Sequence, residues 1–498
     1  MQALLAPLGE LADYQEILKV RKKEEGIIQI AGCVGSQKTH LMYALGDGVE
    51  YRVIVFFSEE KAKKSFDEYR IFTDDVYFYP ARDLLFYYAD IKGNLLTDSR
   101  MGVLRALIEK EKDRSITVIT TMDAFLDGLA SPADLRSHRI RLSGGDVVDL
   151  TELEKKLTET GYQRESQIEG PGQFAVRGGI MDIFPLTEEL PVRIELWGDE
   201  IDSIRSFDPE SQRSVENLDE VMVYPASETW KEGMETVTFL EYFPKEKSLI
   251  FLDEPQRLQE SAESVEQEYF SSRENRIASD LDDAGADLTV YGTKDIINAM
   301  NLYSGIALTT LESRCGLFRV RGIYSIQTKG VNPYNNSFEL LTRDLKRLKR
   351  NGYRVILLSG SRTRAKRLAE DLRDYDLSSF YSEDMERQVN PGEIMVSYGY
   401  VAEGYEYPML KFMVISETDI FGRKKKKKRR KKYEGQKIQN FAELKPGDYV
   451  VHENHGIGIY KGIEKIEVEK VVKDYMKIAY ADGGVLYIPV AQMDLSQE

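Results

Sequence analysis

An apolar run followed at once by a loop with two glycines constrains the fold of this chain most strongly. Residues 26–32 (GIIQIAG) have the length and composition of a buried strand, and GCVGSQKT (32–39) then leads into a helical pattern. A strand, such a loop and a helix in this order are typical of an α/β layer with a mainly parallel sheet. Apolar runs at 52–57, 116–121 and 248–254 predict further strands of the same kind.

The loop nearly matches the phosphate-binding pattern G-x-x-x-x-G-K-[ST]. In that pattern backbone amides and the lysine hold phosphates, and the hydroxyl holds magnesium. Gly32, Lys38 and Thr39 fit, and Gly35 belongs to the same loop. Gln37 stands where the second glycine of the pattern belongs, and a side chain there crowds the amides that would bind phosphate.

An acidic pair, Asp253-Glu254, ends the apolar run at 248–254, in the arrangement of a Walker B pair. Together with Lys38 and Thr39 it predicts a vestigial nucleotide site. Three outcomes stay open: a relic loop kept for packing, weak binding of ATP with magnesium, or true turnover. Hydrolysis in two-lobed motors needs an arginine from a second lobe, and the sequence shows no second loop of this kind. We therefore predict no catalytic residues and no required cofactor.

Neither the cysteines nor the histidines have the spacing of a metal site. Cys33 and Cys315 lie far apart, so we expect free or buried thiols in a reducing cytoplasm. His452 and His455 are close together, but no cysteine or acidic cluster completes a ligand set. The sequence has no apolar run of membrane-spanning length and no secretory signal. It thus predicts a cytoplasmic protein without a metal site or a membrane span.

The net charge of −16 argues against a protein that wraps nucleic acid over most of its surface. The charge is uneven, because residues 423–432 (RKKKKKRRKK) are all basic. One interpretation is a solvated, disordered linker, since like charges repel and no apolar residue anchors a fold. The other adds a transient contact with DNA phosphates, for which the candidates are Arg423, Lys424, Lys425, Arg429 and Arg430.

Local patterns predict an α/β multidomain protein with two smaller units. Residues 192–197 (VRIELW) alternate strictly between apolar and outward-facing positions, and Gly198-Asp199 predicts a tight turn after them. This segment indicates a small antiparallel α+β domain inserted into the first α/β domain. In a second α/β domain, residues 355–360 predict a strand, and Ser361 is the expected cap of the helix that follows.

The end of the chain has the pattern of a small β-barrel. Short strands are expected near 448–452, 457–463, 474–480 and 485–490, with a hairpin turn at 481–484. The predicted division of the whole chain is a first α/β part (1–135), the inserted domain (136–213), the second α/β part of the first domain (214–335), a second α/β domain (336–422), a basic linker (423–440) and the barrel (441–498).

Three segments resemble known families. PGQFAVRGGIMDIFPLTEELPVRIELWGDEIDSIRSFDPESQRS (171–214) closely resembles a stretch of the excision-repair subunit UvrB and of the bacterial transcription-repair coupling factors (Mfd). The tail, LKPGDYVVHENHGIGIYKGIE (444–464) with DYMKIAYADGGVLYIPVAQMDL (474–495), resembles the RNA polymerase-interacting domain of the coupling factors, which UvrB lacks. EGYEYPMLKFMVISETDIFG (403–422) is similar to the stretch before that domain.

The resemblance implies both folds and a function. The front would be a degenerate RecA-like P-loop domain with a UvrA-binding insert, and the barrel would be of Tudor or CarD type. Coupling factors recruit UvrA, and with it nucleotide excision repair, to RNA polymerase stalled at DNA lesions. Their ATP-dependent translocase, of helicase superfamily 2, would release the polymerase and make most of the DNA contact. This sequence lacks that motor, so we expect an adaptor that is the front portion of a longer protein.

Two other functions stay open. One is a UvrB-like, nucleotide-dependent subunit that binds damaged DNA, and the other is a transcription regulator that uses its barrel alone. UvrB carries a long hairpin that clamps DNA, and residues 86–109 leave too little chain for it before the next helix. This difference favours the coupling factors.

For UvrA binding, the resemblance points to a hairpin face around Arg164, Arg177 and Phe184. Arginine and aromatic side chains dominate binding hot spots, and Arg177 can present its planar guanidinium to a carboxylate. The simpler alternatives are that Arg177 pairs with Asp182 or Glu195 inside the sheet, and that Phe184 is a core residue.

For polymerase binding, the family uses an exposed strand edge of the barrel against the β subunit. Edge pairing supplies backbone hydrogen bonds, and alternate side chains add selectivity. The best-matching segment is 462–468, in which Ile466 faces outward if Ile463 points inward. The alternative is that Ile466 is a core residue. The candidate contacts are Ile463, Lys465, Ile466 and Val468.

Overall fold

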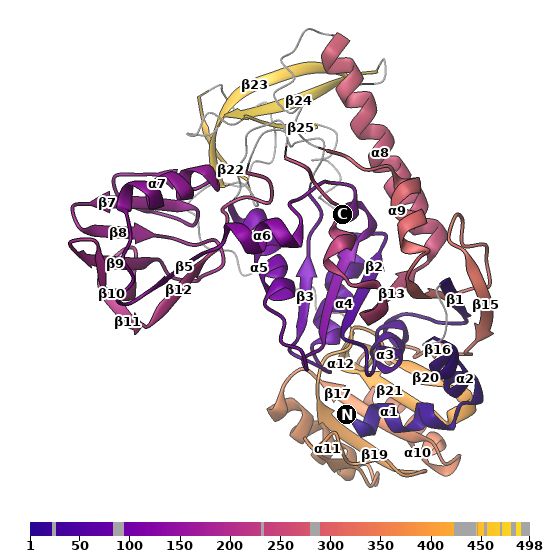
Figure 1. The fold of residues 1–498 in the computed structure, drawn as a ribbon. Helices are drawn as coiled ribbons and strands as arrows, with labels where there is room; N and C mark the ends of the chain where they lie inside the picture. Colours follow the sequence, from indigo (N-terminus) through magenta and orange to yellow (C-terminus); the bar gives the residue numbers. More distant parts are fainter. Residues whose placement is uncertain are drawn as a thin grey trace.

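The computed structural model describes residues 1–21, 26–82, 94–230, 234–278, 289–422, 445, 447–452, 456–468, 471–479 and 485–489. These residues form four large sheets and one two-stranded sheet. In Figure 1 the antiparallel insert projects to one side of the body, and the second α/β unit lies against the first. The predicted α/β multidomain architecture is confirmed at this level.

The first unit is built on a seven-stranded parallel sheet with the order β15-β1-β14-β13-β2-β4-β3. Its central strands are buried along nearly their whole length, as strands covered on both faces must be. The four strands predicted from apolar runs are β1, β2, β4 and β13. The strands are β1 (Gly26–Ala31), β2 (Tyr51–Phe56), β3 (Val76–Tyr79), β4 (Ile116–Thr121), β13 (Ser248–Asp253), β14 (Ser304–Thr309) and β15 (Val320–Ser325).

Helices cover both faces of this sheet. Alternate strand residues face two separate buried clusters, so that Val53 and Val55 belong to one and Ile54 and Phe56 to the other. The helices of this part are α1 (Gln2–Leu5), η1 (Ala6–Glu10), α2 (Ala12–Val20), α3 (Ser36–Leu45), α4 (Glu59–Tyr69), α5 (Asn94–Ile108), η2 (Met122–Phe125), α6 (Pro132–His138), η3 (Phe239–Tyr242), η4 (Lys245–Lys247), α8 (Pro255–Ala278) and α9 (Thr293–Met300).

The insert has a six-stranded sheet with the order β11-β10-β9-β8-β7-β6, antiparallel except for the pair β6-β7. The predicted hairpin is present, since β9 and β10 pair around the turn at Gly198-Asp199. Helix α7 packs Leu153 and Leu157 against one face of the sheet. The elements are β5 (Ile140–Ser143), α7 (Leu150–Glu159), β6 (Gln163–Arg164), β7 (Gln173–Arg177), β8 (Ile180–Ile183), β9 (Val192–Trp197), β10 (Glu200–Phe207), β11 (Ser214–Leu218) and β12 (Glu220–Val223).

The chain enters and leaves the insert along a shared pair of strands, because β5 pairs with β12. The insert therefore extends past its predicted end at residue 213, because β11 and β12 follow that residue. Shortly after β12, the carboxylate of Glu228 accepts a hydrogen bond from Nε of Arg100 on α5, 2.5 Å away. Arg100 also donates to Asp127 Oδ2 at 2.6 Å, and all three side chains are fully buried. Buried charges of this kind are tolerated only when they are paired.

The second α/β unit has a six-stranded sheet with the order β16-β20-β21-β17-β19-β18. The strand predicted at 355–360 is β17, and Ser361 caps α11 by accepting from the amide of Arg364 at 3.3 Å. Helices α10 and α11 cover one face. The elements are β16 (Lys329–Gly330), α10 (Phe338–Arg350), β17 (Arg354–Ser359), α11 (Arg362–Asp374), β18 (Phe380–Tyr381), β19 (Ile394–Tyr398), β20 (Tyr405–Tyr407), η5 (Pro408–Leu410), β21 (Phe412–Ser416) and α12 (Glu417–Phe421).

The last unit is a four-stranded antiparallel sheet in the order β22-β23-β24-β25. Within its described residues the first and last strands do not pair, so the sheet is open, and the predicted barrel closure is not seen. The turn expected at 481–484 lies outside the described residues. The strands are β22 (Tyr449–His452), β23 (Gly456–Val468), β24 (Val471–Ala479) and β25 (Val485–Pro489), of which β23 is longer than the predicted strand.

Other predictions concern the thiols and the membrane. Cys33 and Cys315 are both free and buried, and burial raises the pKa of the Cys33 thiol to about 12. In the part of the chain that the structure describes, no helix is long and apolar enough to cross a membrane. The basic run at 423–432 falls outside that part, and so do residues 86–93 at the start of the segment 86–109, whose shortness was taken as a difference from UvrB.

Candidate functional site

The predicted nucleotide-site residues converge at the carboxyl end of the seven-stranded sheet. The loop from Gly32 to Gly35 joins β1 to α3, and Asp253 ends β13 with Glu254 directly after it. Gly32 has φ +90°, and a Cβ there would lie 2.6 Å from the carbonyl oxygen of Ile326. The close approach of that backbone requires glycine. The predicted strand, loop and helix are therefore present, with Gly32 packed against the backbone of Ile326.

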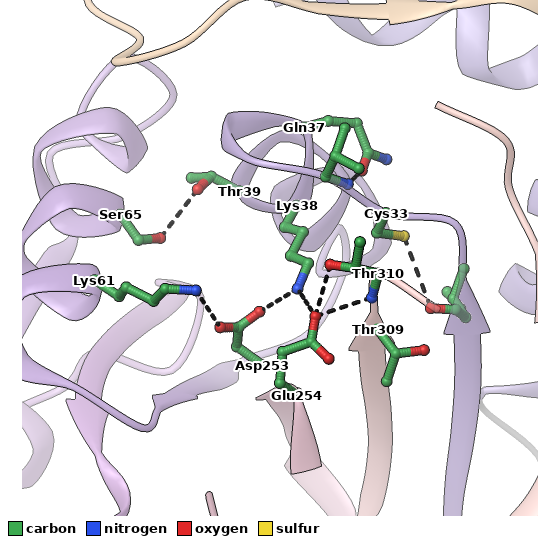
Figure 2. A network of polar contacts seen from close by, with 12 residues as sticks. Cys33, Gln37, Lys38, Thr39, Lys61, Ser65, Asp253, Glu254, Thr309 and Thr310 are labelled. Atoms are coloured by element: carbon green, nitrogen blue, oxygen red, sulfur yellow. Dashed lines mark hydrogen bonds and ion pairs between the residues drawn. The ribbon is translucent and has the colours of Figure 1, made fainter. Parts of the chain in front are cut away.

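Lys38 is held by the acidic pair (Figure 2). Its Nζ lies 2.6 Å from Asp253 Oδ1 and 2.6 Å from Glu254 Oε1, and only 9% of the side chain is exposed. Burial alone would lower the pKa of Lys38, but the two carboxylates outweigh it and raise that pKa. Glu254 also accepts from the amide and the hydroxyl of Thr310, at 2.9 and 2.8 Å. The lysine that would reach phosphates is thus already neutralised.

The Gln37 side chain lies against a loop amide, in line with the expectation that it would crowd those amides. It is fully buried, and its Oε1 accepts from the amide of Val34, 3.3 Å away. Its Nε2 donates to the hydroxyl of Tyr407 in β20, at 3.0 Å. The amide of Val34 in the loop is therefore satisfied by a side chain from the first turn of α3.

Thr39, the expected magnesium ligand, faces another carboxylate. Its hydroxyl donates to Glu68 Oε2 at 2.8 Å, and the hydroxyl of Ser36 donates to the other oxygen of Glu68. Burial raises the pKa of Glu68, while these two hydroxyls and the amide of Ala402 oppose that rise. A buried acid beside the start of α3 disfavours a phosphate there.

A loop of the second α/β unit covers the start of α3. The amide of Glu403 donates to Ser36 Oγ at 3.1 Å, and its carboxylate lies 2.8 Å from Lys64 Nζ. A Cβ built on Gly35 would lie 2.8 Å from Glu403 Oε2. An acidic side chain thus occupies the N-terminus of α3, where the positive pole of the helix dipole favours anions.

His40 adds a chain of hydrogen bonds to the contact between the first and second α/β units. Its Nε2 lies 3.0 Å from the carbonyl oxygen of Leu4, which can only accept, so Nε2 carries the proton. Its Nδ1, 2.9 Å from the hydroxyl of Tyr407, then accepts from that hydroxyl, which itself accepts from Gln37. The chain requires neutral His40, and burial lowers the pKa of His40 to about 4. Sequence reasoning missed Glu68, Glu403 and Tyr407, because no local motif marks them.

The insert does not bring the three predicted UvrA-binding residues onto one face. Arg177, 47% exposed, donates to Asp182 Oδ2 at 2.6 Å, as the simpler alternative expected. Arg164 lies at the same sheet edge but pairs with Glu154 of α7, 3.1 Å away on the helix-covered side. Phe184 is buried in a small cluster with Ile168, Ala175 and Phe207.

The predicted polymerase-binding segment lies in β23. This strand pairs with β24 over 459–468 but with β22 only over 456–459, so among the described strands its later half has one neighbour. Ile463 is 51% exposed, so the inward orientation on which the outward placement of Ile466 was conditional is not seen, and the role of Ile463 as a polymerase contact stays a prediction. Ile463 shares a face with the buried Tyr460 and Ile478 through the strand register, but it lies past the bulge after Tyr460, beyond the buried patch. The side chains of Lys465, Ile466 and Val468 are not among the described ones.

The candidates for a DNA contact, Arg423, Lys424, Lys425, Arg429 and Arg430, all lie outside the described residues. His455 does too. Within the described residues no cluster of His, Cys, Asp or Glu could hold a metal ion.

Replacing Lys38 with Met is expected to lower the free energy of unfolding by about 3 kcal/mol, because buried Asp253 then loses its cation. Lys61→Met is the matched control, since Lys61 is half exposed and 3.9 Å from Asp253, and it should cost less than about 1 kcal/mol. Urea denaturation measures both.

Magnesium-ATP at about 1 mM should leave the Tm of the unmodified chain unchanged. A rise in Tm that Lys38→Met abolishes would contradict this expectation.

Acid should weaken the contact around His40. Its folded pKa, about 4, lies below the usual value of 6.5, so the unfolded chain binds the proton first and stability falls as the pH drops from 6.5 toward 4. At pH 5 this one group should cost about 2 kcal/mol relative to pH 7. His40→Gln should remove that part of the pH dependence, measured as the difference between two urea-denaturation series. Equal slopes in the two series would refute it.

Comparisons with known proteins match the insert and the C-terminal sheet. A family model described as the UvrB interaction domain matches residues 140–228, and one described as the CarD-like/TRCF RID domain matches residues 444–497. The transcription-repair-coupling factor of Bacillus subtilis (strain 168) is 27% identical over 99% of this chain and 46% of its own length. That of Staphylococcus haemolyticus (strain JCSC1435) is 28% identical over 85% of this chain and 40% of its own. The chain spans less than half the length of these relatives, and the predicted resemblance is confirmed.

Proposed function

We propose that this chain, whose relatives are transcription-repair-coupling factors, acts as an adaptor between RNA polymerase and excision repair. The insert would bind UvrA, and the C-terminal sheet would bind the polymerase through its β subunit. The observation that carries this proposal is the presence in one chain of a UvrB interaction domain and a CarD-like/TRCF RID domain. Neither the UvrB-like enzyme nor the regulator that uses its barrel alone accounts for both matches.

We further propose that the first α/β unit is a RecA-like relic that no longer works on nucleotide. In support, Lys38 is neutralised by Asp253 and Glu254, Thr39 bonds to Glu68, and Glu403 occupies the start of α3. A nucleotide would have to displace all of these contacts. Its phosphates would then lie close to the carboxylates of Glu68 and Glu403 at the start of α3. The loop then serves packing between units, and we place an ATP-driven motor in the part of the relatives that this chain does not match.

The polymerase-binding surface is proposed to be the later half of β23. A strand with one neighbour offers backbone donors and acceptors to another chain, and native proteins rarely leave such an edge apolar without a reason. Half-exposed Ile463 lies on this segment. A Tudor- or CarD-like closure of the sheet remains part of this proposal.

Arg177→Ala is expected to weaken UvrA binding at least about tenfold, because it removes a half-exposed guanidinium from the open face of the insert. Folding should be little affected, since Asp182 keeps Arg193 as a partner at 2.7 Å. Arg164→Ala is the matched control on the helix-covered side. Titration of labelled chain with UvrA, and separately with RNA polymerase, measures the effects. No change with either variant would contradict the proposed face, and joint loss of UvrA and polymerase binding would indicate misfolding.

Ile463→Arg is expected to abolish capture of the polymerase β subunit, because a charge then replaces apolar surface on the proposed edge. Ile466→Arg is also expected to abolish capture without changing thermal unfolding, and strand alternation predicts that the two positions face opposite sides. A pull-down with the isolated β subunit compares them, with thermal unfolding as the check on folding. If both variants bind as the unmodified chain does, the edge assignment is wrong.

A further inference from the structure

Trp197 is the most exposed large apolar side chain in the described part of the molecule. It ends β9, just before the turn at Gly198-Asp199, and 85% of its surface is open to water. A tryptophan gains free energy when its ring leaves water, and tryptophan is enriched among the residues that carry most of the binding energy of protein interfaces. The alternating pattern of 192–197 placed this residue outward but gave it no role.

Three loops gather around Trp197 at one end of the insert. They are 144–147, 177–179 and 197–200, every residue of which is exposed, and we call this end the tip. Val147, 79% exposed, lies opposite Glu200, and Glu200 lies opposite Trp197, so the two apolar side chains flank Glu200 on one face. The amide of Leu196 donates to the carbonyl of Gly179 at 2.8 Å, which brings bare backbone beside Trp197.

The charges on the open face of the insert are largely satisfied within the sheet. Asp182 holds both Arg177 and Arg193, and Glu195 pairs with Arg205. A partner gains little by replacing such pairs. Burial of Trp197 needs no pair to be broken, so the ring is the group from which binding gains most.

The rim of the tip is acidic. Asp146, Asp199 and Glu200 are all exposed there, and Arg177 is the basic residue of the three loops. A second copy of this chain would bring one acidic rim against another, which electrostatic complementarity disfavours. The rim instead fits a partner whose apolar pocket is bordered by lysine or arginine.

We propose that Trp197 is the anchor by which the insert binds UvrA, its ring entering an apolar pocket with a basic border. This inference rests on the proposed function, since it assigns the centre of the UvrA interface. Continuity supports it, because Arg177 belongs to the same tip. Trp197 then lies at the centre of the contact, and Arg177 lies at its edge.

The chain has two tryptophans, so fluorescence can follow this ring directly. The other, Trp230, is half-buried, with its ring centroid 5.0 Å from that of His138. Trp230→Phe leaves Trp197 as the reporter. Adding a tryptophan-free variant of UvrA should shift its emission to shorter wavelengths and protect it from quenching by acrylamide.

Trp197→Ala should raise the Kd for UvrA by about 30-fold or more, the scale of an interface anchor. Val215→Ala is the matched control, since Val215 is also well exposed but lies on β11, outside the tip. The Kd of this variant for UvrA should equal that of the unmodified chain. Glu200→Lys should weaken binding and reduce its dependence on salt, because it reverses a charge of the rim.

The outcomes separate this inference from the function on which it rests. If UvrA binds the unmodified chain and Trp197→Ala binds equally well with unshifted Trp197 emission, the anchor is wrong and the adaptor stands. If UvrA does not bind the unmodified chain at all, the proposed function fails first. An emission shift that depends on the concentration of the chain alone would assign the tip to self-association and overturn the inference.

Discussion

One buried cluster runs without interruption from the first α/β unit into the second. It joins Leu4 and Leu8 of the N-terminal segment, Leu41 and Met42 of α3, and Phe412 and Val414 of β21. The polar contacts of Gln37, His40, Ser36 and Glu68 lie beside this shared core and select its arrangement. Because apolar burial is the main favourable term in folding, the position of the second sheet depends on this contact.

Contacts inside the protein account for the residues of the loop between β1 and α3. The loop still needs Gly32 for the approach of the Ile326 backbone, and Lys38 still needs its carboxylates because an unpaired buried charge is costly. Each of these motif residues thus has a structural role within the protein. Gln37, the position that breaks the motif, forms the hydrogen bond that reaches across to Tyr407.

The sequence was informative wherever a feature is local. The strand-loop-helix order at 26–45, the hairpin of β9 and β10, and the cap at Ser361 all follow from patterns a few residues long. Glu68 and Glu403 could not be found this way, because their role arises from contact between segments more than three hundred residues apart. The exposure of Ile463 could not be read from the sequence, because alternation gives the face of a strand residue but not the extent of the layer that covers it.

The junction between the insert and the first unit has a mechanical consequence. The chain crosses it twice, through the paired strands β5 and β12, and the outgoing path is held by Glu228 in its buried contact with Arg100. Both β5 and β12 therefore connect the insert to the first unit, and the Glu228–Arg100 pair links the outgoing chain to α5. Separating the insert from the first unit there would require separating charges away from water, so this charge pair anchors the insert in addition to the two strands.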